Sequence, residues 1–322
     1  MNYLGIDVGS VSINLAVINK DCKLIHKEYL RTEGKPIPKI KKGLQLISDK
    51  FGDMEIGGVG TTGSGRNLAG VMVGADTIKN EITAHAVAAA HLIPDVKTVM
   101  EIGGQDSKII IIRDGVAVDF AMNTVCAAGT GSFLDQQASR LEIPIEDFGD
   151  YALEADSPVR IAGRCSVFAE SDMIHKQQMG HETPEIIAGL CDALVRNYLN
   201  NVGKGKDIQK PIVFQGGVAA NTGIKNAFEK ELETDVFVPE HHDVMGSIGA
   251  AMLGYETMKK RNEQSSFKGF DISDFDFRAQ SFECEGCPNR CEIINIYQND
   301  QLIARWGANC SRWEEKKEVG SL

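Results

Sequence analysis

Short apolar runs separated by tight turns dominate the first fifty residues. The runs at 2–8 and 12–19 flank a Gly-Ser turn, which is typical of a β-hairpin. A third strand is expected near 24–30, and a helix follows over about 38–51. The chain is therefore predicted to open with three strands and a helix.

The same pattern starts again near residue 98. Strands are predicted at 98–102, 108–113 and 116–121, and the turn GGQDS again places glycine beside an acid. Such an internal echo indicates a duplicated α/β lobe that faces its twin across a cleft. The other expected elements are helices at 78–92, 129–141, 166–179 and 184–201, strands at 211–215 and 236–239, and a last helix from about 245.

The composition changes beyond Arg261. The segment NEQSSFKGFDISDFDF is polar and aromatic without helical periodicity, so we interpret it as a linker. The remaining tail, 281–322, contains four of the eight cysteines and is expected to form a small appended module.

Size and charge limit the classes of function that the chain can have. A chain of 322 residues with 43% hydrophobic content can bury a full core in two to three structural units. The net charge of −11 argues against a nucleic-acid partner. No apolar run approaches the roughly 20 residues of a membrane span, and the first residues do not resemble a signal peptide. Eight cysteines in such a chain indicate metal or redox chemistry in a reducing cytoplasm.

The first hairpin turn carries residues suited to a nucleotide. In GIDVGSVSIN (5–14), main-chain N–H groups around Gly9, Ser10 and Ser12 could hold phosphate oxygens. Asp7, at the end of the first strand, is expected to reach Mg²⁺ through water.

Two later turns repeat this chemistry. In EIGGQDSK (101–108), Gly103 and Gly104 allow close backbone approach, and Asp106 offers a second metal-facing carboxylate. Gln105 could orient the attacking water near the γ-phosphate, or it could be a turn residue bonded to backbone. In QGGVAANTG (215–223), the adenosine end of the nucleotide is assigned to Gly216, Gly217 and Asn221.

The combination of the three turns is more informative than any one of them. None is a Walker loop or a GxGxxG dinucleotide turn, and each alone is best explained as an ordinary glycine turn. All three in this order around repeated hairpins resemble the ATPase superfamily of actin, sugar kinases and heat-shock chaperones. That resemblance implies binding of ATP or ADP with Mg²⁺ in a two-lobe α/β fold.

Two cysteines, Cys126 and Cys165, each precede a segment with a helical pattern. A helix N-terminus favours thiolate, and two thiolates are half of the ligands of a four-cysteine iron–sulfur cluster. A two-fold dimer would supply the other two. The alternative for this pair is two buried, inert thiols, which is the preferred interpretation for Cys22 and Cys191.

Further motifs narrow the resemblance. The chain resembles the activators of 2-hydroxyacyl-CoA dehydratases and the ATPase subunits of benzoyl-CoA reductases, the BadF/BadG/BcrA/BcrD type. The resemblance rests on the first two turns together with GTTGSGR (60–66), EITAHA (81–86), CAAGTGSFLD (126–135) and CSVFAESD (165–172). The match covers residues 1 to about 260. It implies a homodimer with one [4Fe–4S] cluster at its interface, held by Cys126 and Cys165.

The resemblance also implies an activity and partners. ATP hydrolysis would drive a low-potential electron from the cluster into a partner iron–sulfur enzyme, with ferredoxin or flavodoxin as the donor. The implied arrangement is one ATPase lobe over 1–95, completed by the helix at 245–262, a second lobe over 96–244, and a linker and cysteine-rich tail over 263–322. The chain departs from the family pattern at Ser12, Ile13 and Asn14, where a lysine or Thr-Lys pair is usual, and at Glu101, where an aspartate is usual.

The tail holds a separate set of cysteines. The spacing C-x2-C-x3-C-x18-C, formed by Cys284, Cys287, Cys291 and Cys310, suits a tetrahedral sulfur site. Zn²⁺ and a second iron–sulfur cluster are both chemically plausible, and disulfides or free thiols are the alternative. The tail resembles those of some atypical activators, including reductases of double-cubane-cluster proteins. It could instead dock a partner through Trp306 and Trp313.

Two other functions compete with the electron-transfer activator. A small-molecule kinase of the same fold would need a catalytic base in the cleft and would give Cys126 and Cys165 no role. An ATP-gated chaperone or regulator would hydrolyse ATP slowly and bind unfolded or regulatory partners, and the long peptide-binding domain expected of a chaperone is absent from the sequence.

Overall fold

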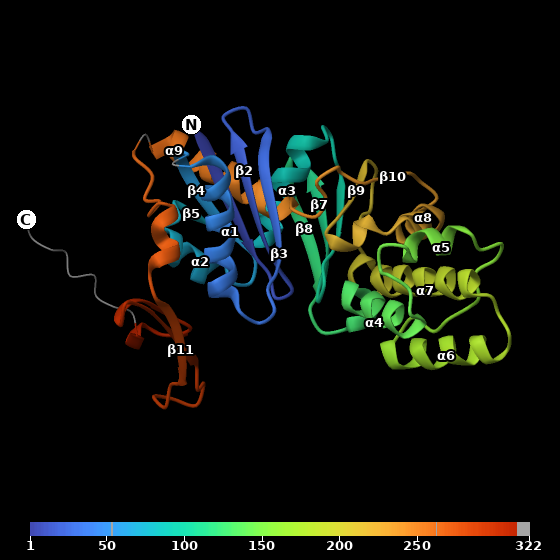
Figure 1. The fold of residues 1–322 in the computed structure, drawn as a ribbon. Helices are drawn as coiled ribbons and strands as arrows, with labels where there is room; N and C mark the ends of the chain where they lie inside the picture. The colour runs from blue at the N-terminus through green and yellow to red at the C-terminus, as the bar shows by residue number, and fades with distance from the viewer. Residues whose placement is uncertain (53, 262, 314–322) are drawn as a thin grey trace, which may run out of the picture.

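The computed structural model describes residues 1–52, 54–261 and 263–313. Its main body contains two five-stranded sheets with the same topology (Figure 1). The first has the order β3-β2-β1-β4-β5, and the second the order β10-β9-β6-β7-β8. In each, a three-strand antiparallel meander is followed by two strands parallel to its first strand. The prediction of a duplicated α/β unit is confirmed.

The strand bounds follow the apolar runs closely. Antiparallel β1 and β2 place Asp7 opposite Asn14 beside the first turn. The strands of the first sheet are β1 Asn2–Val8, β2 Ser12–Asn19, β3 Leu24–Arg31, β4 Ile56–Thr62 and β5 Thr77–Ile78. Those of the second are β6 Thr98–Ile102, β7 Ser107–Arg113, β8 Val116–Asn123, β9 Ile212–Gln215 and β10 Val236–Phe237.

Helices cover both faces of both sheets. The helices are α1 Pro36–Phe51, α2 Arg66–Val73, α3 Glu81–Leu92, α4 Gly131–Leu141, α5 Phe148–Leu153, α6 Ser166–Gln178, α7 Thr183–Tyr198, α8 Thr222–Leu232 and α9 Met245–Arg261. Helix α1 begins two residues earlier than predicted, because prolines are well tolerated in its first turn. The predicted helix 184–201 is α7 followed by a π-helical turn, Leu199–Gly203.

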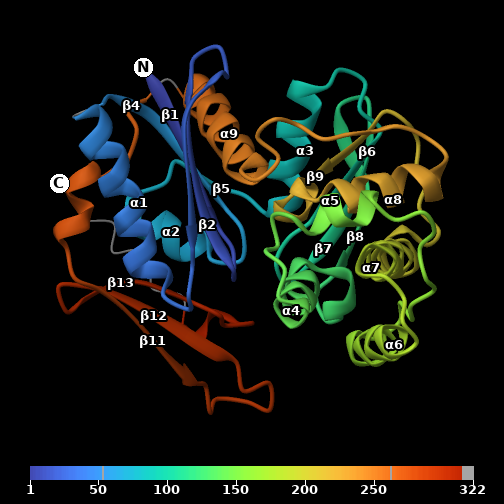
Figure 2. The same ribbon diagram turned by 45° about the vertical axis from the view of Figure 1, so that its right-hand side comes forward.

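Alternating side chains of the strands build three hydrophobic cores. Outer residues of the first sheet, such as Leu4, pack with α1 and α2. Inner residues of both sheets enclose α3 and α9, which lie between the sheets (Figure 2). On the far face of the second sheet, Met100 and its neighbours pack against α4, α5, α7 and α8. The molecule is thus a five-layer stack with two central helices.

Close backbone contact holds α9 against the first sheet. A Cβ on Gly60 would lie 1.9 Å from the Ala250 carbonyl oxygen, and one on Gly5 would lie 1.8 Å from that of Ser247. Glycine is therefore required at these strand positions, since any side chain would push the helix away. This contact fixes the start of α9 next to Asp7, with a Cβ on Gly246 placed only 2.0 Å from the Asp7 carboxylate.

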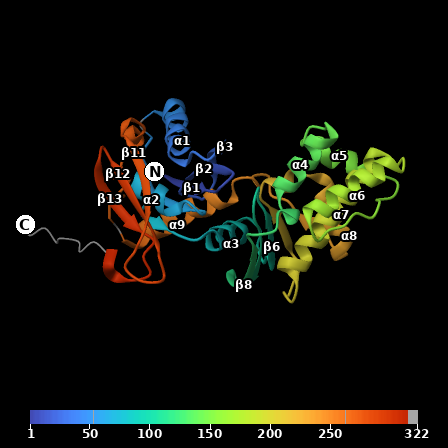
Figure 3. The same cartoon turned by 90° about the horizontal axis from the view of Figure 1, so that it is seen from below.

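The region after α9 is packed rather than free. The segment predicted as a linker contains a 3₁₀-helix, Phe270–Asp274, whose Phe270 and Ile272 are buried in the core of the first sheet. Asp76 also accepts hydrogen bonds from Ser265 and Ser266. A three-stranded antiparallel sheet follows, formed by β11 Phe277–Glu283, β12 Glu292–Gln298 and β13 Gln301–Trp306. This C-terminal sheet lies at one end of the molecule, and α6 lies at the other (Figures 1 and 3).

Candidate functional site

A cavity of about 250 Å³ lies where the first turns of the two sheets face each other. It is lined by loops from both halves of the duplicated unit and by the start of α9. The sequence-predicted residues that it brings together are Asp7, Gly9, Ser10, Ser12, Gly103, Gly104, Gln105, Asp106, Gly216 and Gly217. Residues more than 200 positions apart in the chain therefore meet in one cleft.

A second cavity of about 240 Å³ adjoins the first and shares Gly103, Gly104 and Gly217 with it. Asn221 lines this second cavity and caps α8, where its Oδ1 accepts the N–H of Ile224 at 3.0 Å. Its amide Nδ2 is buried and, within the described chain, has no hydrogen-bond partner. A buried donor without a partner is costly, so this atom is well suited to bind a polar group of a ligand. Asn221 therefore offers a donor for a polar ligand group at this end of the two adjoining cavities.

The glycine loops that line the cleft have little room for side chains. Gly216 has φ +92°, and a Cβ there would lie 2.4 Å from the Ile102 carbonyl oxygen. A Cβ on Gly104 would lie within 3 Å of the Val11 side chain, which belongs to the opposite hairpin. Backbone N–H groups can approach an anion closely in such loops.

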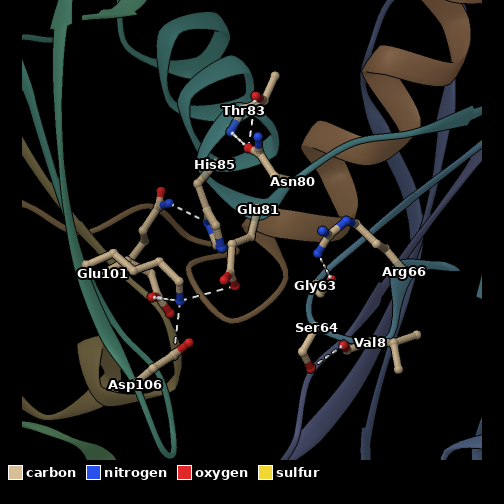
Figure 4. Close-up of polar contacts among 12 residues, drawn as sticks. Val8, Gly63, Ser64, Arg66, Asn80, Glu81, Thr83, His85, Glu101 and Asp106 are labelled. Atoms are coloured by element: carbon tan, nitrogen blue, oxygen red, sulfur yellow. Dashed lines mark hydrogen bonds and ion pairs between the residues drawn. The ribbon is translucent and has the colours of Figure 1, made fainter. Parts of the chain in front are cut away.

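Charged side chains concentrate at the floor of the cleft around Lys108. Its Nζ lies 2.7 Å from Glu101, 3.0 Å from Asp106 and 3.3 Å from Glu81. Figure 4 shows these three carboxylates converging from separate elements. Glu81 occupies the first turn of α3, which Asn80 caps through a 2.9 Å hydrogen bond to the N–H of Thr83. Lys108 thus connects the second sheet to the central helix layer.

The electrostatics of this floor favour a bound cation. Burial and repulsion by Glu81 raise the pKa of Asp7 to about 7. Burial also raises the pKa of Glu101, although Lys108 opposes this effect. Burial disfavours the charge on Lys108, but the surrounding carboxylates outweigh it and raise the Lys108 pKa. Four carboxylates with one ammonium leave negative charge that a divalent cation can compensate.

His85 lies beside the same cluster and is held neutral. Burial, reinforced by Lys108, lowers the pKa of His85 to about 4. Its Nδ1 is 2.6 Å from the amide Nε2 of Gln215, which can donate to a neutral ring. His85 therefore does not compete with a cation for the carboxylates near neutral pH.

Replacing Lys108 with methionine should destabilise the fold by about 3–5 kcal/mol, because the buried Glu101 carboxylate loses its counter-ion. Urea unfolding at pH 7.5 measures the change. The matched control is Lys39→Met, which removes an ion pair to the exposed Glu33 and should have little effect. A Lys108→Met protein as stable as this control would contradict the structural role of the lysine.

The two cysteine loops meet near the start of α4 and α6. Cys165 directly precedes α6, whereas Cys126 precedes a 3₁₀ turn, Ala127–Gly129, that leads into α4. The 3₁₀ turn contacts α6. Asn123 fixes the Cys126 backbone by accepting its N–H at 2.9 Å and donating to its carbonyl at 2.8 Å.

Asn197 joins the two loops. Its Nδ2 donates to the carbonyl of Gly163, two residues before Cys165, and lies 3.9 Å from the Cys126 sulfur. Both thiols are partly exposed and unbridged. Within the described residues, no group of three His, Cys, Asp or Glu side chains is arranged to hold a metal ion. The thiols of one chain thus offer two soft ligands, and a four-ligand cluster would need a second pair.

The sequence contained signals for some functional residues that we did not assign from it. Glu81 and His85 lie four positions apart in EITAHA, a spacing that puts both on one face of α3. Lys108 ends the EIGGQDSK motif, which also contains two of its partners, Glu101 and Asp106, whereas the third partner, Glu81, comes from α3. Asn197 is a polar residue among the mostly apolar buried side chains of α7.

Comparisons with known proteins agree with this geometry. Residues 4–254 match the model of the BadF/BadG/BcrA/BcrD ATPase family. The (R)-2-hydroxyglutaryl-CoA dehydratase activating ATPase of Acidaminococcus fermentans is 36% identical over 265 residues, which is 80% of this chain and 98% of that protein. None of the helices in the described part of the chain is long and apolar enough to cross a membrane.

Solved structures show the same fold. The activator of the 2-hydroxyisocaproyl-CoA dehydratase from Clostridium difficile, with bound ADPNP, superposes with a TM-score of 0.74 at 29% identity, covering 81% of this chain and 97% of that one. A ROK family glucokinase from Streptomyces griseus has a TM-score of 0.50 at 12% identity, covering 80% of this chain and all of that one, and this likeness concerns the fold alone. The predicted two-lobe α/β fold is confirmed.

Proposed function

The chain belongs to the BadF/BadG/BcrA/BcrD ATPase family, and from this premise we propose that it is an ATP-driven activator that transfers electrons to a partner enzyme. In the proposal, two copies share one [4Fe–4S] cluster held by Cys126 and Cys165 of each copy. The acceptor is an iron–sulfur enzyme such as a 2-hydroxyacyl-CoA dehydratase or a double-cubane-cluster protein. The donor is ferredoxin or flavodoxin, and the compartment is the cytoplasm.

One observation carries the proposal: the nucleotide cleft and the Cys126 loop share the first turn of α4. The N–H groups of Gly131 and Ser132 donate to the carbonyls of Gly103 and Gly104 at 2.9 and 2.8 Å. Cys126 lies only five residues before Gly131. A shift of the Gly103–Gly104 turn on hydrolysis would therefore move the start of α4 and the cysteine loop with it. A kinase that transfers phosphate within the cleft has no need of such a connection.

Apolar exposure around the cysteines supports a dimer. Val125 is 94% exposed beside Cys126, and Val167 and Phe168 are 66% and 65% exposed beside Cys165. Exposed apolar side chains gathered at one site are typical of an interaction surface. A two-fold pairing at this surface brings together the four thiols that a cluster requires.

Residues of the cleft take separate roles in the proposal. Asp7 and Asp106 orient Mg²⁺ through water, and Gln105, exposed in the cleft, orients the attacking water. The glycine turns hold the phosphates, and Asn221 holds the adenosine end. When bound, the cluster supplies a one-electron carrier.

The test is purification of the full chain under anaerobic conditions. We expect brown protein with about four iron and four sulfide per dimer, together with slow ATP hydrolysis. The partner is identified by anaerobic pull-down from the native host. Its reduction should depend on ATP and stop with a non-hydrolysable analogue. Colourless protein that consumes ATP only when a small acceptor substrate is added would overturn the proposal in favour of a kinase.

A further inference from the structure

Four cysteines lie in and just after the C-terminal sheet, outside the region that matches the family. Cys284, Cys287 and Cys291 all lie in the loop that joins β11 to β12. The N–H of Cys284 donates to the carbonyl of Cys291 at 2.8 Å, which continues the ladder of the two strands by one pair. The loop is therefore anchored at its base, with three thiols within eight residues.

The fourth cysteine, Cys310, follows β13, the strand at the other edge of the sheet. A 3₁₀-helix, Ser311–Trp313, lies against the loop, and Cys310 directly precedes it. Arg312 covers Gly286 so closely that a Cβ there would lie 1.7 Å from its guanidinium. The Trp313 ring also packs on Phe282, with ring centroids 5.1 Å apart.

The sulfur of Cys284 has the surroundings of a metal-bound thiolate. It accepts the indole N–H of Trp313 at 3.2 Å and the backbone N–H of Gly286 at 3.4 Å. Hydrogen bonds of this kind orient sulfur ligands and disperse their charge in metal sites. Gly286 lies between Cys284 and Cys287, so one of these two hydrogen bonds comes from the short loop that the C-x2-C pair itself forms.

The C-terminal sheet also lacks a core of its own. Among the described residues 277–313, the buried side chains are Phe277, Cys284, Ile293, Asn295 and Ile296. Phe277 belongs to the core of the first sheet rather than to this one. A module of this size with so little buried apolar surface usually needs a metal ion or disulfides. All four cysteines are unbridged.

We propose that Cys284, Cys287, Cys291 and Cys310 together bind one Zn²⁺ ion, which closes the end of the C-terminal sheet. The four thiols lose their protons as the ion binds, and no electron transfer is involved. In the described conformation no three of these sulfurs are placed to hold an ion at once. Binding therefore draws the exposed Cys287 and Cys310 toward Cys284.

This centre is distinct from the proposed interface cluster. The C-terminal sheet and α6, which Cys165 precedes, occupy opposite ends of the molecule in both views (Figures 1 and 3). The zinc site does not depend on the proposed function, and its test uses Cys126→Ser only to exclude iron bound at the proposed interface.

The experiment counts zinc and iron separately in the full chain, purified anaerobically from zinc-supplemented cells. A Cys126→Ser background removes the interface iron. We expect about one zinc per chain in this background and near zero after a further Cys284→Ser or Cys287→Ser change. Cys22→Ser, in the first half of the chain, is the matched control and should keep its zinc. Reconstitution with Co²⁺ in place of zinc should give the sulfur-to-cobalt charge-transfer absorption of a tetrathiolate site.

Three results would overturn the proposal. One is a chain without zinc, with or without disulfides among these cysteines. Another is zinc that persists in both tail variants. The third is iron with sulfide that survives Cys126→Ser and disappears with Cys284→Ser, because the tail would then hold a cluster. Retained ATP hydrolysis in the tail variants verifies that the main body is folded.

Discussion

Replacing Cys126 with serine should remove essentially all cluster iron from the anaerobically purified protein. In the proposed dimer one substitution removes two of four ligands, because each copy contributes the same residue. The fold should survive, since Asn123 binds the backbone N–H and carbonyl of residue 126 and not its sulfur. Iron and sulfide analysis should fall from about four per dimer to near zero, with little change in thermal unfolding.

The same loss is expected for Cys165→Ser. Cys22→Ser is the control, because this thiol packs against the inner core and should not bind iron. ATP hydrolysis should persist in all three variants, since the cleft contains none of these cysteines. Iron retained at the wild-type level after either the Cys126 or the Cys165 substitution would refute the ligand assignment.

Local sequence patterns predicted much of the main body. The hairpin turns and their repeat are local, because a Gly-Ser or Gly-Gly turn between apolar runs fixes strand direction and register over a few residues. Asp7, Gly103 and Asp106 could be assigned for this reason, and they do meet in one cleft. Asn221, which the QGGVAANTG motif assigns to the nucleoside end, lines the adjoining cavity.

Contacts between distant elements could not be predicted in this way. Glu101 and Asp106 lie close to Lys108 in the sequence, but Glu81 lies on α3, so only the fold shows that all three carboxylates surround the ammonium group. Asn197, on α7, contacts both the Cys126 loop and the Cys165 loop, and this contact too depends on how distant segments pack. The segment after α9 has the polar composition of a linker, which obscures its two buried side chains, Phe270 and Ile272. Composition indicates how a segment is solvated on average, whereas packing depends on a few positions.

Replacing Asp7 with asparagine should nearly abolish ATP hydrolysis while making the nucleotide-free protein more stable at pH 8. The loss of activity follows from the proposed Mg²⁺ role. An electrostatic contribution of about 3 kcal/mol corresponds to a rate decrease of roughly 100-fold. Steady-state phosphate release with saturating Mg·ATP measures this decrease, and cluster iron should be unchanged.

The gain in stability follows from the raised pKa. Asp7 titrates near pH 7 in the folded protein, because burial and Glu81 disfavour its charge, and near pH 4 when unfolded. The folded state therefore binds the Asp7 proton more tightly than the unfolded state does. The protonated carboxyl contributes its full stabilisation to the folded protein below about pH 4. That stability is lost as the pH rises from about 4 through 7. Asparagine carries no such charge, so the variant escapes the loss.

Urea unfolding of the two proteins at several pH values tests the sign and the window. Each pKa unit corresponds to about 1.4 kcal/mol, so the variant should gain up to about 4 kcal/mol at pH 8 and little at pH 4.5. The exposed Asp21→Asn is the control and should show no such difference. A variant less stable than wild type at pH 8 would mean that the ionised carboxylate stabilises the folded protein. With the gain observed, loss of activity together with added stability would identify Asp7 as a residue kept for catalysis at the expense of the fold.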